Sequence, residues 1–93
     1  MQMIALEDID YIEGLEDYIK IHLHNARPVL TLMTLKAVLE KLPEAKFRRI
    51  HRSYIVAVDK VKSVQGKKLV LTADTELPIS DSYADFVQDW MKR

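Results

Sequence analysis

Apolar and polar side chains alternate along residues 18–24, and this pattern constrains the fold more than any other stretch of the chain. One side would carry Ile19, Ile21 and Leu23, and the other side Lys20, His22 and His24. A period of two is typical of a β-strand that buries one face and leaves the other in solvent. The pattern therefore predicts a β-strand here, with both histidines on the solvent side.

Several other short stretches predict that strands dominate the fold. They are residues 9–13, 28–33, 54–58, 61–64, 68–73 and 76–79, which are rich in β-branched, aromatic and other apolar residues. Both glycines fall between such stretches. Gly14 predicts a tight connection over residues 14–17, and Gly66 a hairpin connection over residues 65–67.

Two helices complete the expected elements. Thr34 is a suitable N-cap, and Pro43 stops the helix that follows it. At about two turns, this helix is too short to be stable alone and must pack its leucine face on the sheet. The second helix begins at Ser80 or Ser82, since Ser82 with Asp85 forms a variant of the capping box.

A cationic run precedes one of the predicted strands. Arg49, His51, Arg52 and Ser53 fall within five positions, directly before residues 54–58. Guanidinium, imidazole and hydroxyl donors suit phosphate oxygens, and a buried strand could hold them in place. This run predicts that the chain binds nucleic acid.

The charge distribution is uneven although the net charge is zero. Six of the fourteen acidic residues fall within the first seventeen positions, whereas Lys46 to Lys68 holds eight basic residues and one acidic residue, Asp59. A basic segment of this kind favours nucleic acid as a partner. The alternative is a solvated basic surface beside an acidic one.

With 93 residues, the chain is expected to form a single domain that buries about two thirds of its unfolded surface. It has no cysteine, no apolar run long enough to span a bilayer and no basic start typical of a signal peptide. We therefore expect a cytoplasmic protein without membrane contact. Core-like sequence follows Met1 almost directly, which suggests a fragment of a longer polypeptide.

Metal sites and enzymes are poorly supported by the sequence. His22 and His24 could chelate a divalent ion, but no third ligand has a characteristic spacing. The chain lacks a glycine-rich phosphate loop and a nucleophile set in a turn between glycines. Nothing in the sequence indicates that His51 forms a catalytic pair with Asp59 or Asp81. We expect no enzyme activity, no cofactor and no metal.

Four blocks in order connect the chain to a known family. They are residues 8–22, residues 30–36, residues 47–56 followed by Asp59-Lys60, and residues 77–80 with Tyr83. Together they resemble the LytTR-type DNA-binding domain of bacterial response regulators, over nearly the whole chain. The most specific block contains Arg49-Ile50-His51-Arg52-Ser53-Tyr54-Ile55-Val56.

This resemblance implies a mainly β fold: small antiparallel sheets, one short internal helix and a C-terminal helix. It also implies that three connections enter the major groove, namely Gly14 to Tyr18, His51 to Ser53 and Ser80 to Ser82. The DNA-binding residues would be Asp17, Tyr18, Arg49, His51, Arg52, Ser53, Ser80, Asp81 and Ser82. Arg52 would either donate two hydrogen bonds to guanine or clamp a phosphate, and Arg49 and Ser53 would position phosphates.

Acidic residues depart from the family pattern within these connections. Asp81 stands where the family commonly carries a basic residue, and Glu16 stands where it commonly carries a basic or neutral residue. Asp17 stands where a reading side chain may lie. A carboxylate is repelled by phosphate but can accept from cytosine N4, so these residues either weaken binding or redirect its sequence preference. Asp81 also suits the first turn of the last helix, at the positive end of its dipole.

The resemblance also implies a biological context. Residues 1–93 would be one LytTR-like domain, the output part of a two-component response regulator with an upstream receiver domain. Its target would be double-stranded DNA with paired direct repeats, occupied by two protomers, and transcription would be the output. The alternative is a protein-interaction module on the same fold, in which Glu16, Asp17 and Asp81 have abolished DNA binding.

Overall fold

The computed structural model describes residues 4–92, which form two antiparallel sheets, two α-helices and three 3-10 helices. The elements in chain order are η1 (Leu6–Asp8), β1 (Ile9–Leu15), β2 (Tyr18–Leu23), β3 (Val29–Leu32), α1 (Leu35–Glu40), β4 (Phe47–His51), β5 (Tyr54–Ala57), η2 (Val58–Lys60), β6 (Val61–Gln65), β7 (Lys68–Leu71), β8 (Glu76–Pro78), η3 (Asp81–Tyr83) and α2 (Asp85–Met91). The mainly β fold with a short internal helix and a C-terminal helix is thereby confirmed.

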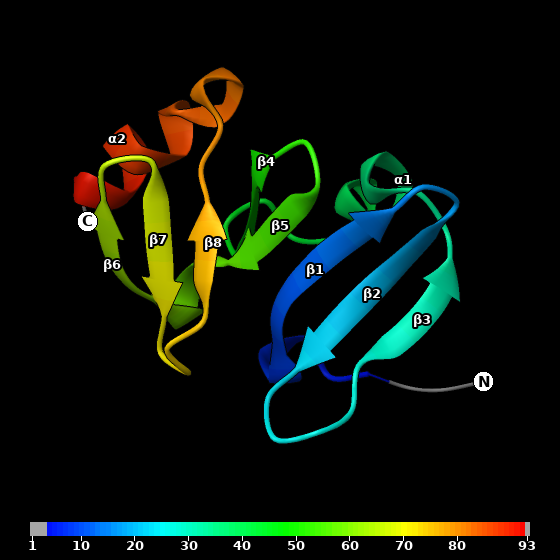
Figure 1. Ribbon diagram of the computed structural model, residues 1–93. Coiled ribbons are helices and arrows are strands. Elements are labelled where there is room, and N and C mark those ends of the chain that lie inside the picture. Colours follow the sequence, from blue (N-terminus) through cyan, green and yellow to red (C-terminus); the bar gives the residue numbers. More distant parts are fainter. Residues whose placement is uncertain (1–3, 93) are drawn as a thin grey trace.

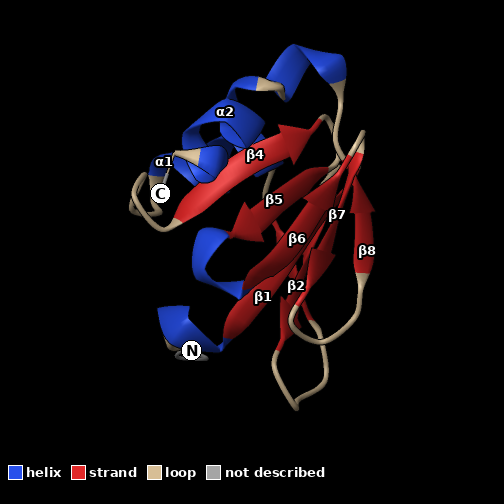
Figure 2. Cartoon of the chain, turned by 90° about the vertical axis from the view of Figure 1, so that its left-hand side faces the viewer, coloured by secondary structure: helices blue, strands red, loops and turns tan. Residues whose placement is uncertain are grey.

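The larger sheet has the strand order β3-β2-β1-β5-β4, and the smaller sheet has the order β6-β7-β8. Figure 1 shows the two sheets side by side, with the β4–β5 hairpin between the other strands of each. Figure 2 shows that both α-helices lie beside β4, on the same side of the strands. No helix among residues 4–92 is long and apolar enough to cross a membrane.

Two hydrophobic cores hold the β4–β5 hairpin from opposite faces. Ile55 belongs to the core between the larger sheet and α1, whereas Val56 belongs to the core shared with the smaller sheet and α2. Successive side chains of a strand point to opposite faces, so this one strand serves both cores. Each such buried side chain contributes about 1.5–3 kcal/mol. The turn that joins β4 to β5 is therefore anchored on both sides.

The predicted alternation in β2 is confirmed, because Ile19 and Ile21 are buried. The prediction for His22 was wrong. Its ring is only partly exposed and stacks on Tyr11, with centroids 4.1 Å apart, and Nε2 lies 3.2 Å from a carboxylate oxygen of Glu13. Tyr11 packs against the second core, so this part of the face predicted to be solvated is partly covered.

The connection expected at Gly14 lies two residues further on. Gly14 pairs with Ile19 inside the β1–β2 ladder, and Glu16 takes the positive φ of 56° in the turn. A Cβ atom at Gly14 would lie 2.9 Å from both Cγ and Cδ1 of Leu35 on α1. Gly14 is therefore required for close packing of the helix on the sheet. At Gly66 the expectation is confirmed, because its φ of 62° lies in the hairpin turn between β6 and β7.

Two further expectations differ from the structure. Residues 47–51 form strand β4, which the sequence did not predict, because a bulge between Arg49 and His51 breaks the period of two. The prediction of a capping box at Ser82 was wrong. Helix α2 begins after Ala84 without a side-chain cap, and it is Ser80 that caps the preceding turn η3, its Oγ accepting from the Ser82 amide at 3.3 Å.

Candidate functional site

The three connections singled out in the sequence lie along one edge of the molecule, the upper edge in Figure 1. Backbone hydrogen bonds link them. The Gly14 amide donates to the Ser53 carbonyl at 2.8 Å, and the Ser80 amide donates to the Ile50 carbonyl at 2.8 Å. Ile50 directly precedes His51 at the end of β4, so both ends of the β4–β5 turn are held beside the other two connections by peptide groups alone.

Arg49 braces the central connection from within. Its Nε donates to the His51 carbonyl at 3.2 Å, and a terminal nitrogen donates to the Arg52 carbonyl at 2.6 Å. The guanidinium carbon also lies 5.5 Å from the centre of the Tyr83 ring in η3, within range of a cation–π contact. Arg49 therefore holds the shape of the turn and joins it to the third connection, which leaves it fewer donors for phosphate.

Arg52 occupies the tip of the same turn and is exposed. Its guanidinium makes no hydrogen bond or ion pair with any side chain or backbone group of residues 4–92. Ser53, which follows it, is half-buried and donates its amide to Nδ1 of His51 at 3.1 Å. Arg52 is thus the cation of the turn that is available to an external partner.

The first connection presents Glu16, Asp17 and Tyr18, all exposed. Together with Arg52 and Ser53, Glu16 lines an open hollow whose other wall is the first turn of α1, including Lys36. Lys36 was not among the residues singled out in the sequence. The N-cap at Thr34, which was predicted, could have indicated that the start of this helix lies near the connections.

The third connection is acidic but locally neutralised. Asp81 lies in η3, 3.3 Å from the ammonium of Lys67, and both side chains are about four-fifths exposed. Asp81 does not lie in α2, so the expected role at the dipole of the last helix is not fulfilled. Ser80 and Ser82 both contribute to the capped turn rather than to the helix.

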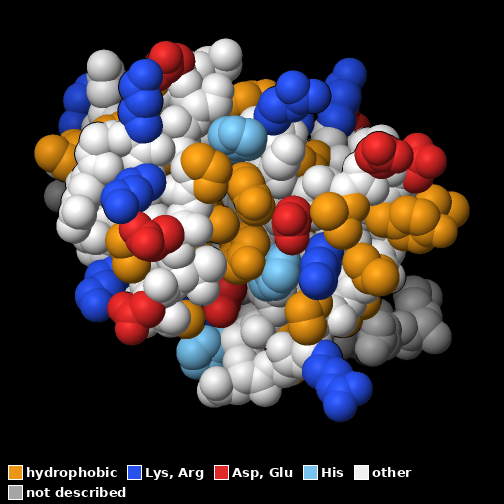
Figure 3. Space-filling model, viewed as in Figure 1, with side chains coloured by type: hydrophobic (Ala, Val, Ile, Leu, Met, Phe, Trp, Pro, Cys, Tyr) orange, Lys and Arg blue, Asp and Glu red, His pale blue; other side chains and the backbone are white. Residues whose placement is uncertain are grey.

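The basic segment between Lys46 and Lys68 is largely paired with acids. Five of its eight basic residues form ion pairs: Arg48 with Asp89, Lys60 with Asp10, Lys62 with Asp74, Lys67 with Asp81 and Lys68 with Glu76. Figure 3 accordingly shows Lys and Arg side chains along the upper edge with acidic side chains beside them, and no continuous basic patch on this face. Folding therefore neutralises much of the basic segment with acidic residues that lie elsewhere in the sequence.

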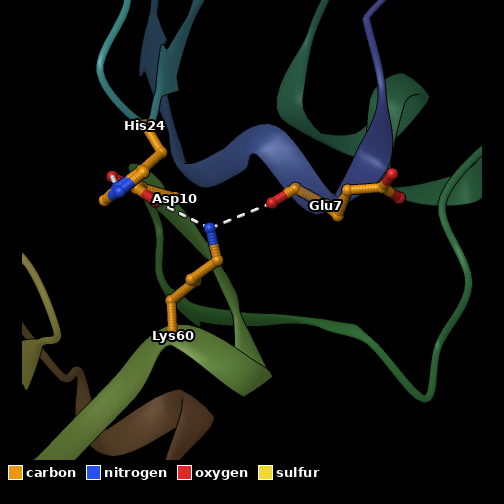
Figure 4. Close-up of polar contacts among 4 residues, drawn as sticks. All are labelled: Glu7, Asp10, His24 and Lys60. Atoms are coloured by element: carbon orange, nitrogen blue, oxygen red, sulfur yellow. Dashed lines mark hydrogen bonds and ion pairs between the residues drawn. The ribbon is translucent and has the colours of Figure 1, made fainter.

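Lys60 takes part in a cluster at the opposite end of β1. Its ammonium lies 3.1 Å from the Asp10 carboxylate and 3.0 Å from the Glu7 carbonyl, and His24 lies 3.8 Å from the same carboxylate (Figure 4). Among residues 4–92, Asp10 is the one charged residue that is buried. The cluster joins η2 to the start of β1 and therefore serves the fold, away from the three connections.

A metal centre is not assembled from the described residues. Within residues 4–92, no three His, Asp or Glu side chains converge in a way that could hold an ion. His22 and His24, considered together in the sequence, are engaged separately by Glu13 and Asp10.

Comparisons with known proteins identify the family to which the chain is similar. A family model described as the LytTr DNA-binding domain matches residues 1–92. Sensory transduction protein LytT of Bacillus anthracis is 32% identical over 88 residues, which cover 88% of this chain and 35% of that protein. The Bacillus cereus protein of the same name is 31% identical with the same coverage. The chain thus spans about a third of the length of these curated relatives. A solved LytTr DNA-binding domain from Bacillus cereus has a TM-score of 0.82 at 22% identity, over 95% of this chain and 84% of that one.

Proposed function

Because the chain belongs to the LytTR DNA-binding domain family, we propose that it binds a specific sequence of double-stranded DNA through its three connections, which would enter the major groove. The observation that carries this proposal is the joining of the three connections by backbone hydrogen bonds, with Arg52 exposed at the centre. An edge that is held together by backbone hydrogen bonds can present several side chains to the edges of the bases at the same time.

The residues divide into two roles under this proposal. Arg52 reads guanine or clamps a phosphate, and Asp17, Tyr18, Ser80, Asp81 and Ser82 approach the DNA from the flanking connections. Arg49 acts mainly by holding the turn, since its guanidinium already donates to two carbonyls there. Ser53 holds the turn through its amide, while its hydroxyl makes no hydrogen bond within residues 4–92 and can still position a phosphate. Asp17 is exposed and could accept from cytosine N4. Asp81, paired with Lys67, carries less net repulsion toward phosphate than its charge alone suggests.

The wider context is proposed from the relatives. They are named sensory transduction proteins, and the chain matches about a third of each. We propose that residues 1–93 are one domain, the output part of a cytoplasmic response regulator that acts on transcription without enzyme activity of its own. The remainder of such a protein would contain a receiver domain, and two protomers would occupy paired direct repeats.

Titration of labelled duplex at two salt concentrations tests the proposal, after selection of a preferred site from a random library. Affinity should fall with salt, with a logarithmic slope of about 0.9 for each phosphate contact. Arg52→Ala should weaken binding to the selected site by about 1–3 kcal/mol, and weaken random duplex less. Lys62→Ala is the matched control, because Lys62 is exposed and paired with Asp74 on the smaller sheet. If Arg52→Ala lost the same affinity for both duplexes, Arg52 would not read the base sequence.

One observation favours the second candidate, a protein-interaction module. Leu15, Tyr18, Leu30 and Leu32 are exposed, from 41% to 70%, and strand pairing places them on the face of the larger sheet away from α1. Exposed apolar groups that gather in this way often mark protein contacts. This candidate requires absence of salt-dependent duplex binding, together with concentration-dependent association in sedimentation experiments.

A further inference from the structure

His51 is held at both its backbone and its ring. Its carbonyl accepts from Nε of Arg49 at 3.2 Å, and its Nδ1 accepts from the Ser53 amide at 3.1 Å. The ring also lies 5.6 Å from the Tyr54 ring, tilted by 52°. The imidazole therefore has one orientation at the end of β4, beside Arg52 at the tip of the turn.

The bond from Ser53 decides where the imidazole carries its proton. A ring nitrogen that accepts an amide N–H must present a lone pair, so in the neutral ring the hydrogen is on the other nitrogen. We assign this hydrogen to Nε2 of His51. Within residues 4–92, Nε2 has no hydrogen-bonding partner, and the side chain is partly exposed.

We propose that His51 is a fixed hydrogen-bond donor in the DNA interface: Nδ1 holds the turn, and the Nε2 hydrogen is offered to an acceptor on the duplex. The inference rests on the proposed function and adds the donor atom, and hence the kind of acceptor, for one contact with the duplex. With its hydrogen on Nε2, the neutral ring can donate to a purine N7, a guanine O6, a thymine O4 or a phosphate oxygen. It does not bind the amino group of cytosine, which is itself a donor.

The tautomer is measured first, on the free protein. Long-range proton–nitrogen NMR spectra of uniformly labelled protein separate the two neutral tautomers of each histidine. We expect the His51 signals of the form protonated on Nε2. The form protonated on Nδ1 would overturn the proposal whatever the DNA-binding result.

Two substitutions separate holding the turn from contact with DNA. In His51→Asn the amide oxygen can replace Nδ1 as acceptor for the Ser53 amide, but nothing replaces the Nε2 donor. His51→Ala removes both. We expect His51→Asn to keep most of the thermal stability that His51→Ala loses, whereas both lose five-fold or more in affinity for the selected duplex. Wild-type affinity of a stably folded His51→Asn would overturn the donor role.

Modified duplexes identify the acceptor. Single 7-deazapurine replacements remove N7, and single methylphosphonates remove a charged phosphate oxygen, at each position of the selected site. One replacement should weaken wild-type binding and have no further effect on His51→Asn, which assigns the contact to a base or to the backbone. If no replacement shows this dependence on His51, including replacements of O6 and O4, the contact does not exist. If the wild-type protein binds no duplex at all, the proposed function fails, and the donor role at DNA fails with it, while the tautomer assignment stands by itself.

Discussion

Gly14→Ala tests how the first connection is positioned. The added Cβ would lie 2.9 Å from both Cγ and Cδ1 of Leu35, closer than carbon atoms pack without displacement. Leu35 cannot simply swing away, because it is 6% exposed and lies in the first turn of α1. The substitution must therefore shift the helix, the strand or the leucine rotamer.

The expected cost follows from this overlap. Overpacking of a well-filled core costs about 1–3 kcal/mol. Alanine for glycine within a strand would otherwise be neutral or favourable, since glycine loses more conformational freedom on folding. We expect a net loss of about 1–3 kcal/mol in the free energy of unfolding, and each kcal/mol lowers Tm by roughly 4–8 °C for a domain of this size.

Urea denaturation followed by circular dichroism measures this loss, and a double-mutant cycle identifies its cause. Leu35→Ala alone should cost about 2–5 kcal/mol, because it leaves a cavity under α1. In the double variant the methyl group of Gly14→Ala enters that space, so its cost should disappear and the coupling should reach about 1–3 kcal/mol. A Gly14→Ala protein as stable as wild type, or costs that simply add, would refute the packing argument.

Two other expectations concern buried polar groups. Asp10→Ala leaves the partly buried ammonium of Lys60 without its carboxylate and should cost about 1.5–3 kcal/mol, whereas Lys62→Ala, from an exposed pair, should change stability by less than about 0.5 kcal/mol; urea denaturation of both variants checks the contrast. Burial first, and then the nearby charge of Glu13, raise the pKa of the Tyr11 phenol. Because the folded pKa exceeds the unfolded value of about 10, the contribution of this phenol to stability is complete below that pH and is lost as pH rises through the folded pKa. Ultraviolet titration should therefore show a late-ionising tyrosine that Tyr11→Phe removes, and its absence would contradict the assignment.

The regular parts of the fold were predictable from local pattern. Alternation around Ile19 and Ile21 predicted β2, and Thr34 predicted the start of α1, where its hydroxyl accepts from the Ala37 amide at 3.1 Å. These signals depend on residues close in the sequence, so no knowledge of the tertiary structure was needed. The order of the four blocks supplied the rest of the fold class.

What the sequence could not supply depends on distant contacts. The bulge before His51 hid β4, because Phe47 and Ile50 are buried three residues apart instead of two. Gly14 was interpreted as a turn residue, since nothing local indicates that Leu35 lies against it. At the site, the three connections were predicted, but the carbonyl contacts of Arg49 were not. Such contacts depend on the shape of a turn that exists only in the folded protein.

The hydrogen bonds between the connections have an evolutionary consequence. The donors at Gly14 and Ser80 and the acceptors at Ser53 and Ile50 are all peptide groups. Amino-acid replacements at the exposed tips leave these groups in place, proline excepted at the two donors. If the three connections bind DNA as proposed, binding preference can diversify among descendants of this domain through Glu16, Asp17, Arg52 or Asp81 while the spacing of the three tips is inherited unchanged.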